Sequence, residues 1–179
     1  MSKNTQTDFF LKQPSRFVKK GEVLVRSGFT SEESFYVVKG CLRSFVVDEK
    51  GKEHIYQFAP EDWLISDLEF FRNKNVAFLT IDAVEDSEIK VVSMTLFRDL
   101  SMADNELMRE GFTKMQKRIH ALQRRIIQLL SYTAEQRYQD FISTYPNLHQ
   151  RVPLKMIASY LGVTPESLSR VRKEMVKGK

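Results

Sequence analysis

The sequence predicts an α+β protein: an antiparallel β-structure, then one long helix, then a small helical domain. Three observations predict it, namely short β-rich runs between glycines in residues 17–92, a heptad pattern over 104–130, and two short helical segments at 154–173. A chain of 179 residues, 42% hydrophobic and 28% charged, suits a globular protein with one large or two small domains. The expected domains are 1–103, 104–132 and 133–179.

The first domain begins with a short helical segment, residues 8–13, which Pro14 ends. Strands are expected at 22–26, 34–38, 42–47, 55–58, 76–81 and 88–92. The turns between them require positive φ, and the glycines there are Gly21, Gly28, Gly40 and Gly51. Residues 48–52 read as the turn of a hairpin. Many short, evenly spaced strands indicate a sandwich, barrel or roll, and residues 93–100 then turn helical.

The long helix carries one apolar seam whose spacing alternates between four and three residues. β-Branched Ile119 and Ile126 occupy position a with Phe112, and leucines dominate position d, a combination typical of a parallel two-stranded coiled coil. The alternative is an amphipathic helix packed on its own domain, and we favour the dimer helix. The expected dimer interface is Met108, Phe112, Met115, Ile119, Leu122, Ile126 and Leu129.

A candidate hinge at 131–133 follows the long helix. Thr133 and Gln136 have the spacing of a capping box, which predicts a helix from there to about Tyr145. Residues 146–152 are expected to form a polar connection.

Residues 154–173 fit a helix-turn-helix at nearly every restricted position. Pro153 suits the first position of one helix, Gly162 permits a left-handed turn, and Thr164 with Pro165 can begin the second helix. The apolar faces expected to pack together are Ile157, Ala158 and Leu161 on the first helix, and Leu168, Val171 and Met175 on the second. The alternative is a helical hairpin that only packs.

Charge supports a nucleic-acid partner for this end of the chain. Residues 1–113 carry 15 Lys/Arg against 19 Asp/Glu, whereas residues 114–179 carry 13 against 4. A basic face can also be merely solvated, but here it coincides with the helix-turn-helix. The side chains with the chemistry to contact bases and phosphates are Lys155, Thr164, Glu166, Ser167, Ser169, Arg170, Arg172 and Lys173.

Other function classes find little support. Cys41 is the only cysteine, so neither an internal disulfide nor an iron–sulfur cluster is expected, and a reducing cytoplasm follows. No apolar run is long enough to span a bilayer, and the N-terminus lacks the apolar core of a signal peptide. We find no catalytic or metal-ligand spacing and expect no enzyme. The three histidines are scattered, and packed or surface roles suit them better than haem ligation.

The whole chain resembles the CRP/FNR transcription regulators, whose founding member is the cyclic AMP receptor protein. The resemblance covers nearly all 179 residues, including Phe17–Glu22, Phe35–Gly40 and Glu61–Phe70. It implies an N-terminal β-roll like a cyclic nucleotide-binding domain, a dimerisation helix and a C-terminal helix-turn-helix. It also implies a homodimer that reads a near-palindromic operator through a recognition helix at 165–176.

The nucleotide pocket departs from that family. By our alignment the ribose-binding glutamate falls at Asp67, and the Arg-Ser pair that holds the phosphate falls at Ala77 and Phe78. Loss of the arginine removes the charged partner of a buried phosphate, so we do not expect cyclic AMP to bind. The expected effector pocket is altered or vestigial, its ligand unknown, and its residues are Ser66, Asp67, Ala77, Phe78, His120 and Gln123.

The implied partners are double-stranded DNA, a second copy of the chain and RNA polymerase. A small-molecule effector is compatible with this reading, and no membrane partner is expected. No cofactor is expected. The β-hairpin wing that often follows the recognition helix is absent before Lys179, through family variation or because the chain is shortened. The alternative function is a ligand-sensing or protein-interaction module that does not read DNA.

Overall fold

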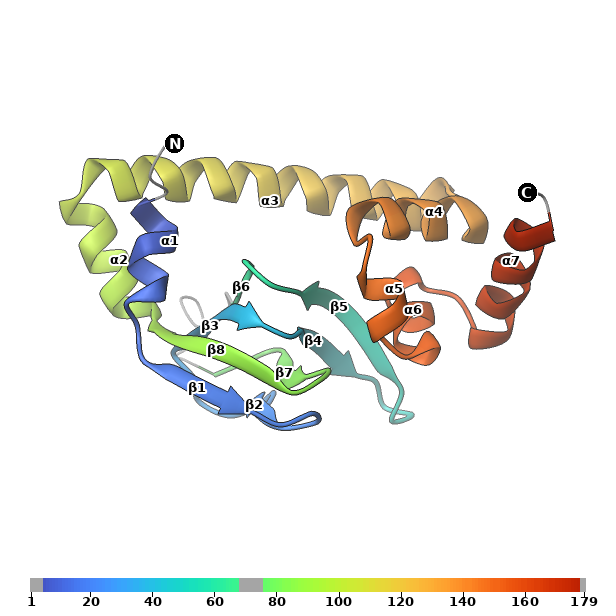
Figure 1. Cartoon of the computed structure of the whole chain (residues 1–179), viewed down its shortest axis with the longest axis horizontal. Coiled ribbons are helices and arrows are strands. Elements are labelled where there is room, and N and C mark those ends of the chain that lie inside the picture. The colour runs from blue at the N-terminus through green and yellow to red at the C-terminus, as the bar shows by residue number, and fades with distance from the viewer. Residues whose placement is uncertain (1–4, 68–75, 178–179) are drawn as a thin grey trace. The chain divides into compact units, whose positions relative to one another are not determined.

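The computed structural model describes residues 5–67 and 76–177 (Figure 1). Its residues form two compact units. The first contains residues up to Val46 and Tyr56–Lys117, and the second contains Val47–Ile55 and Arg118 onward. The tip of one hairpin therefore groups with the C-terminal helices. These units are groups of packed residues, and the three domain boundaries expected from sequence stay a prediction.

The first unit is built on two antiparallel four-stranded sheets, ordered β1-β8-β3-β6 and β2-β7-β4-β5. The strands are β1 (Ser15–Val18), β2 (Val23–Val25), β3 (Glu33–Lys39), β4 (Leu42–Val47), β5 (Glu53–Ala59), β6 (Leu64–Ile65), β7 (Thr80–Ala83) and β8 (Ser87–Ser93). Side chains from both sheets share one core, including Phe35 and Ile89 from the first and Leu42 and Ile81 from the second. This confirms the α+β class, and of the sandwich, barrel or roll expected before the long helix the structure shows a sandwich.

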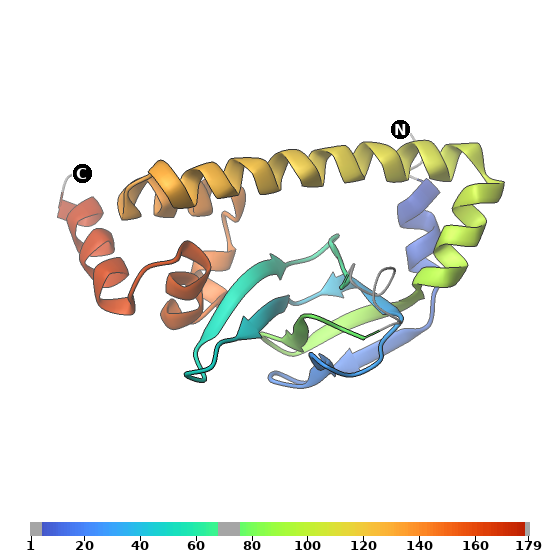
Figure 2. The same cartoon turned by 180° about the vertical axis from the view of Figure 1, so that it is seen from behind.

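Turn chemistry between the strands follows the sequence closely. The four glycines expected to have positive φ do so, at values between 75° and 97°. Gly40 is the most constrained, because a Cβ there would lie 2.2 Å from Ser87 Oγ. In the hairpin that joins β4 to β5, Asp48 Oδ1 accepts hydrogen bonds from the amides of Lys50 and Lys52, at 2.9 and 3.0 Å. Figure 2 shows this hairpin from behind.

The first unit also contains α1 (Thr5–Leu11), α2 (Met94–Ala103) and the first part of α3 (Asn105–Ser131). The rest of α3, from Arg118, belongs to the second unit. Phe10 packs in an aromatic cluster with Tyr36 and Phe97. The first amides of α1 are satisfied by one carboxylate of α3, since Glu110 Oε1 and Oε2 accept from the amides of Thr5 and Gln6 at 3.1 and 2.8 Å.

The second unit holds the remaining helices: α4 (Ala134–Thr144), α5 (Leu148–Arg151), α6 (Leu154–Leu161) and α7 (Pro165–Lys177). The capping box at the start of α4 is confirmed, with Thr133 Oγ1 accepting from the Gln136 amide and Gln136 Oε1 accepting from the Thr133 amide. Buried aromatic side chains of α4 and its end, Tyr138, Phe141 and Tyr145, supply much of this unit's core.

Several sequence expectations need correction. The stretch 146–152 is not a polar connection, because it contains α5, whose Leu148 is buried. Strand β7 begins at Thr80 rather than 76, and Val76 forms only an isolated bridge with Thr30. Strands β1 and β6 were not expected as such; β6 has two residues, too few for a pattern.

Candidate functional site

Helices α6 and α7 form the expected helix-turn-helix. Gly162 ends α6 in the left-handed region, with φ 67° and ψ 36°, and Ala158 O accepts from the Val163 amide across the turn at 3.0 Å. Pro153 stands just before α6 rather than at its first helical position, and its carbonyl accepts from Met156 and Ile157. Most of the predicted apolar faces are buried, namely Ile157, Ala158 and Leu161 on α6 and Leu168 and Val171 on α7, while Met175 is half-buried.

The start of α7 carries the predicted cap. Thr164 Oγ1 accepts from the Ser167 amide at 3.2 Å, which satisfies one amide that the helix leaves unpaired. The Glu166 carboxylate lies against its own amide and the Thr164 side chain, and these hydrogen bonds lower the pKa of Glu166. Glu166 is therefore a carboxylate at neutral pH, able to accept a hydrogen bond from a base amine.

The polar face of α7 is open to solvent. Glu166, Arg170, Arg172 and Lys173 are exposed, and Ser167 and Ser169 are half-buried. On α6, Lys155 is exposed as well. Glu166, Arg170 and Lys173 thus lie on the side of α7 opposite the buried Leu168, the arrangement a recognition helix needs, whereas Arg172 lies at the edge of the buried face.

Two residues of this unit were missed by sequence reasoning. Ser159 on α6 and Arg125 on α3 both bind the β4–β5 hairpin. Their main-chain partners lie 70 to 106 residues away along the chain, so no local pattern reveals the contact. Arg137 also supports the turn, because its Nη1 donates to Leu161 O at 2.7 Å.

The expected effector pocket is represented in the first unit by Ser66, Asp67, Ala77 and Phe78. Ser66 and Ala77 are buried, whereas Phe78 is 63% exposed. One Asp67 oxygen, Oδ2, accepts from the amides of Phe78 and Leu79 at 2.5 and 2.6 Å. The amides of Phe78 and Leu79 therefore already donate to the Asp67 carboxylate, a contact that the sequence did not predict.

The other two expected pocket residues, His120 and Gln123, are exposed on α3 and belong to the second unit. Their role in a pocket stays a prediction. Within residues 5–67 and 76–177, no group of three His, Cys, Asp or Glu side chains is placed to hold a metal ion. None of the helices described there is long and apolar enough to cross a membrane.

The apolar seam of α3 is open to solvent in the single chain. Met108, Phe112, Met115, Ile119, Ile126 and Leu129 are each between 42% and 60% exposed, and Leu122 is half-buried. Six large apolar side chains in one stripe are unusual on a surface and suit a contact with another helix.

Comparisons with known proteins agree with this architecture. A family model described as cyclic nucleotide-binding domain matches residues 15–104. The chain is 28% identical over 171 residues to the transcriptional activator protein FnrA of Stutzerimonas stutzeri, covering 87% of this chain and 68% of FnrA. It is 22% identical over 162 residues to the cAMP-activated global transcriptional regulator CRP of Salmonella typhimurium, covering 84% and 76% respectively.

The solved structure of FixK2 from Bradyrhizobium japonicum shares the fold, with a TM-score of 0.81 at 17% identity over 93% of this chain and 85% of FixK2. A match to the cyclic nucleotide-binding domain is followed here by a helix-turn-helix, and the two relatives are named as a transcriptional activator and a transcriptional regulator. The chain belongs to the CRP/FNR family of transcriptional regulators, as the resemblance in its sequence implied.

Proposed function

We propose that this regulator binds DNA as a homodimer and reads a near-palindromic operator through residues 165–176. The observation that carries the proposal is the division of α7 into a buried face, with Leu168 and Val171, and an exposed polar face, with Glu166 and Arg170. Relatives named as transcriptional regulators support the same reading.

The dimer supplies the symmetry. A parallel pairing through the α3 seam gives two copies of α7 related by a two-fold axis. Two recognition helices so related reach successive major grooves when they lie about 34 Å apart, one turn of the duplex. Arg170 and Glu166 are one helical turn apart on α7, so both can point into the same groove. Arg170 can donate to guanine O6 and N7, while Arg172, Lys173 and Lys155 are suited to phosphates.

Replacing Arg170 by Ala tests sequence reading. We expect a loss of about 1–3 kcal/mol on the preferred site and a relaxed preference at one base pair, because a bidentate contact with guanine is lost. The preferred site is first selected from random duplexes with the wild-type protein, and affinities are then measured by fluorescence anisotropy at several salt concentrations.

Lys173→Ala is the matched comparison. It removes a cation from the same helix, and we expect it to weaken all duplexes alike and to flatten the dependence of affinity on salt. Equal losses for Arg170→Ala on preferred and random DNA would show that Arg170 does not read sequence. Wild-type protein without any salt-dependent DNA binding would instead favour a ligand-sensing or protein-interaction module.

Cyclic AMP is not the effector in this proposal. The segment aligned with the phosphate-binding pair offers Ala77 and Phe78 in place of arginine and serine, and its amides already bind the Asp67 carboxylate. Among the described residues of this segment, neither Ala77 nor Phe78 offers a phosphate a charged partner, and the Asp67 carboxylate would repel it. The remaining candidates for a cation nearby, Arg72 and Lys74, lie outside the described residues.

Calorimetry with cyclic AMP should therefore give no saturable heat at micromolar nucleotide. The Salmonella typhimurium regulator, which is named as cAMP-activated, provides the positive control under identical conditions. A micromolar dissociation constant for this chain would mean that the alignment of the pocket is wrong, or that Arg72 or Lys74 has taken the arginine's role.

The same proposal covers the remaining partners. We infer that the dimer works in the cytoplasm, where the DNA is, and that it meets RNA polymerase there. The buried, single Cys41 is compatible with a reducing compartment.

A further inference from the structure

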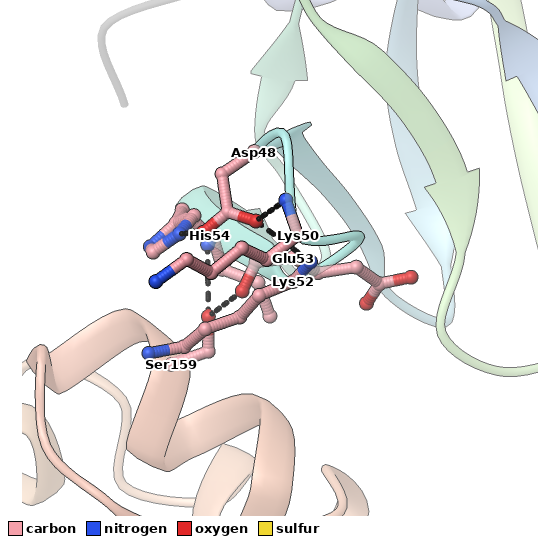
Figure 3. Close-up of polar contacts among 7 residues, drawn as sticks. Asp48, Lys50, Lys52, Glu53, His54 and Ser159 are labelled. Atoms are coloured by element: carbon pink, nitrogen blue, oxygen red, sulfur yellow. Dashed lines mark hydrogen bonds and ion pairs between the residues drawn. The ribbon is translucent and has the colours of Figure 1, made fainter.

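A serine of the helix-turn-helix is bonded to the main chain of the β4–β5 hairpin. Ser159 Oγ on α6 donates to Glu53 O at 2.7 Å and accepts from the Ile55 amide at 3.1 Å (Figure 3). One hydroxyl thus satisfies a carbonyl and an amide two residues apart on the same side of a strand, as a neighbouring strand would. Because both partners of Ser159 are main-chain atoms, the contact depends on the position of the hairpin backbone and not on the side chains of the hairpin.

An arginine reinforces this contact from α3. Arg125 Nη2 donates to Ile55 O at 3.1 Å and to Tyr160 O at 2.9 Å. Its guanidinium also lies 3.7 Å from the centre of the Tyr160 ring, and Tyr160 in turn contacts Phe141 and Tyr145. Arg125 therefore connects α3, the hairpin and α6. We call the hydrogen bonds that Ser159 and Arg125 make to the hairpin the hairpin clasp.

The hairpin is itself held in shape. Asp48 Oδ2 lies 2.7 Å from His54 Nε2, and Asp48 Oδ1 accepts from two amides of the turn (Figure 3). These hydrogen bonds, led by that from His54, lower the pKa of Asp48, which keeps its carboxylate charged at neutral pH. The clasp therefore attaches α6 to a defined turn rather than to a loose loop.

We propose that the turn of the β4–β5 hairpin is a working part of the DNA-binding unit, and that Ser159 and Arg125 are positioning residues for the recognition helix. Helix α6 has 8 residues and is too short to be stable alone. Its apolar residues Ile157, Ala158 and Leu161 are buried, while Ser159 binds the hairpin. Releasing the clasp would free α6, and α7 with it, to change orientation relative to the hairpin. This inference rests on the proposed DNA-binding function.

Ser159→Ala tests the clasp directly. Hydrogen exchange of the Ile55 amide, followed by NMR, should become about 10-fold faster, because that amide loses its acceptor. Affinity for the DNA site selected by the wild-type protein should fall about 3- to 10-fold, as expected for loss of one or two hydrogen bonds. Ser159→Thr keeps the hydroxyl and should restore both values. Ser143→Ala, on the exposed side of α4, is the control and should change neither.

Arg125→Lys provides a second variant. A lysine keeps the charge but cannot reproduce the planar guanidinium stacked on Tyr160, so DNA affinity should again fall several-fold. Arg124→Lys is its control, because Arg124 is the adjacent arginine and pairs with Asp140 instead.

The outcomes separate the clasp from the function. Unchanged exchange at Ile55 in Ser159→Ala overturns the clasp, and faster exchange with unchanged DNA affinity overturns the positioning role. A wild-type protein that binds no DNA overturns the proposed function and the positioning role with it, while exchange at Ile55 still decides whether the clasp exists.

Discussion

Ile119→Glu should convert the protein from a dimer into a monomer and abolish binding to the near-palindromic site. Ile119 is 50% exposed in the single chain and stands at position a in the middle of the seam. In a parallel dimer two glutamates would face each other in an apolar interface with no cation to pair with, and burying such charges costs several kcal/mol each. Light scattering over a range of protein concentrations measures the change.

Ala121→Glu is the control for this variant. Ala121 is exposed on the same helix but lies off the seam, so the new charge should remain in water and the dimer should persist. If Ile119→Glu stays dimeric at the concentrations where the wild type is dimeric, the seam is not the interface. The two copies of α7 would then have to be related in another way.

Asp82→Asn should lower the free energy of unfolding by about 3–5 kcal/mol, because it removes the carboxylate charge that pairs with a buried guanidinium. Arg43 Nε and Nη2 bind the two Asp82 oxygens at 2.7 and 2.8 Å, and the side chains are only 5% and 10% exposed. The pair joins the adjacent strands β4 and β7, and the Arg43 guanidinium also lies 4.2 Å from the Phe45 ring centre. Urea denaturation measures the loss.

Asp99→Asn is the matched comparison for the buried pair. Asp99 pairs with Arg98 on the surface, where side-chain exposures are 51% and 58%, so water and salt screen the interaction and less than about 1 kcal/mol should be lost. Similar losses for both variants would mean that the Arg43–Asp82 pair contributes no more than an exposed one.

Elements that depend on local chemistry were predictable from the sequence. The long helix was expected over 104–130 and spans Asn105–Ser131, because its heptad pattern continues for about three repeats, from Met108 to Leu129. The capping box at Thr133 and the left-handed Gly162 each depend on residues within a few positions of one another. Such features need only residues close together in the sequence and no long-range contact.

Features that depend on distant partners were not predictable. Asp67 aligns with the family's ribose-binding glutamate, but the alignment does not reveal that its carboxylate accepts hydrogen bonds from two amides 11 and 12 residues further along the chain. Ser159 had no visible role until the fold brought β5 beside α6. The short helix α5 was missed because four residues are too few to show a helical period, and its existence depends on burying Leu148.

The carboxylate that completes α1 has a consequence for the order of events during synthesis. Helix α1 has 7 residues, too few to persist alone, and the acceptor for its first amides, at Thr5 and Gln6, is Glu110. Glu110 is made more than a hundred residues later, which at about 5–20 residues per second means roughly 5–20 s. The first turn of α1 therefore lacks this acceptor while both sheets are translated, and it gains it only after α3, with its apolar seam, has left the ribosome.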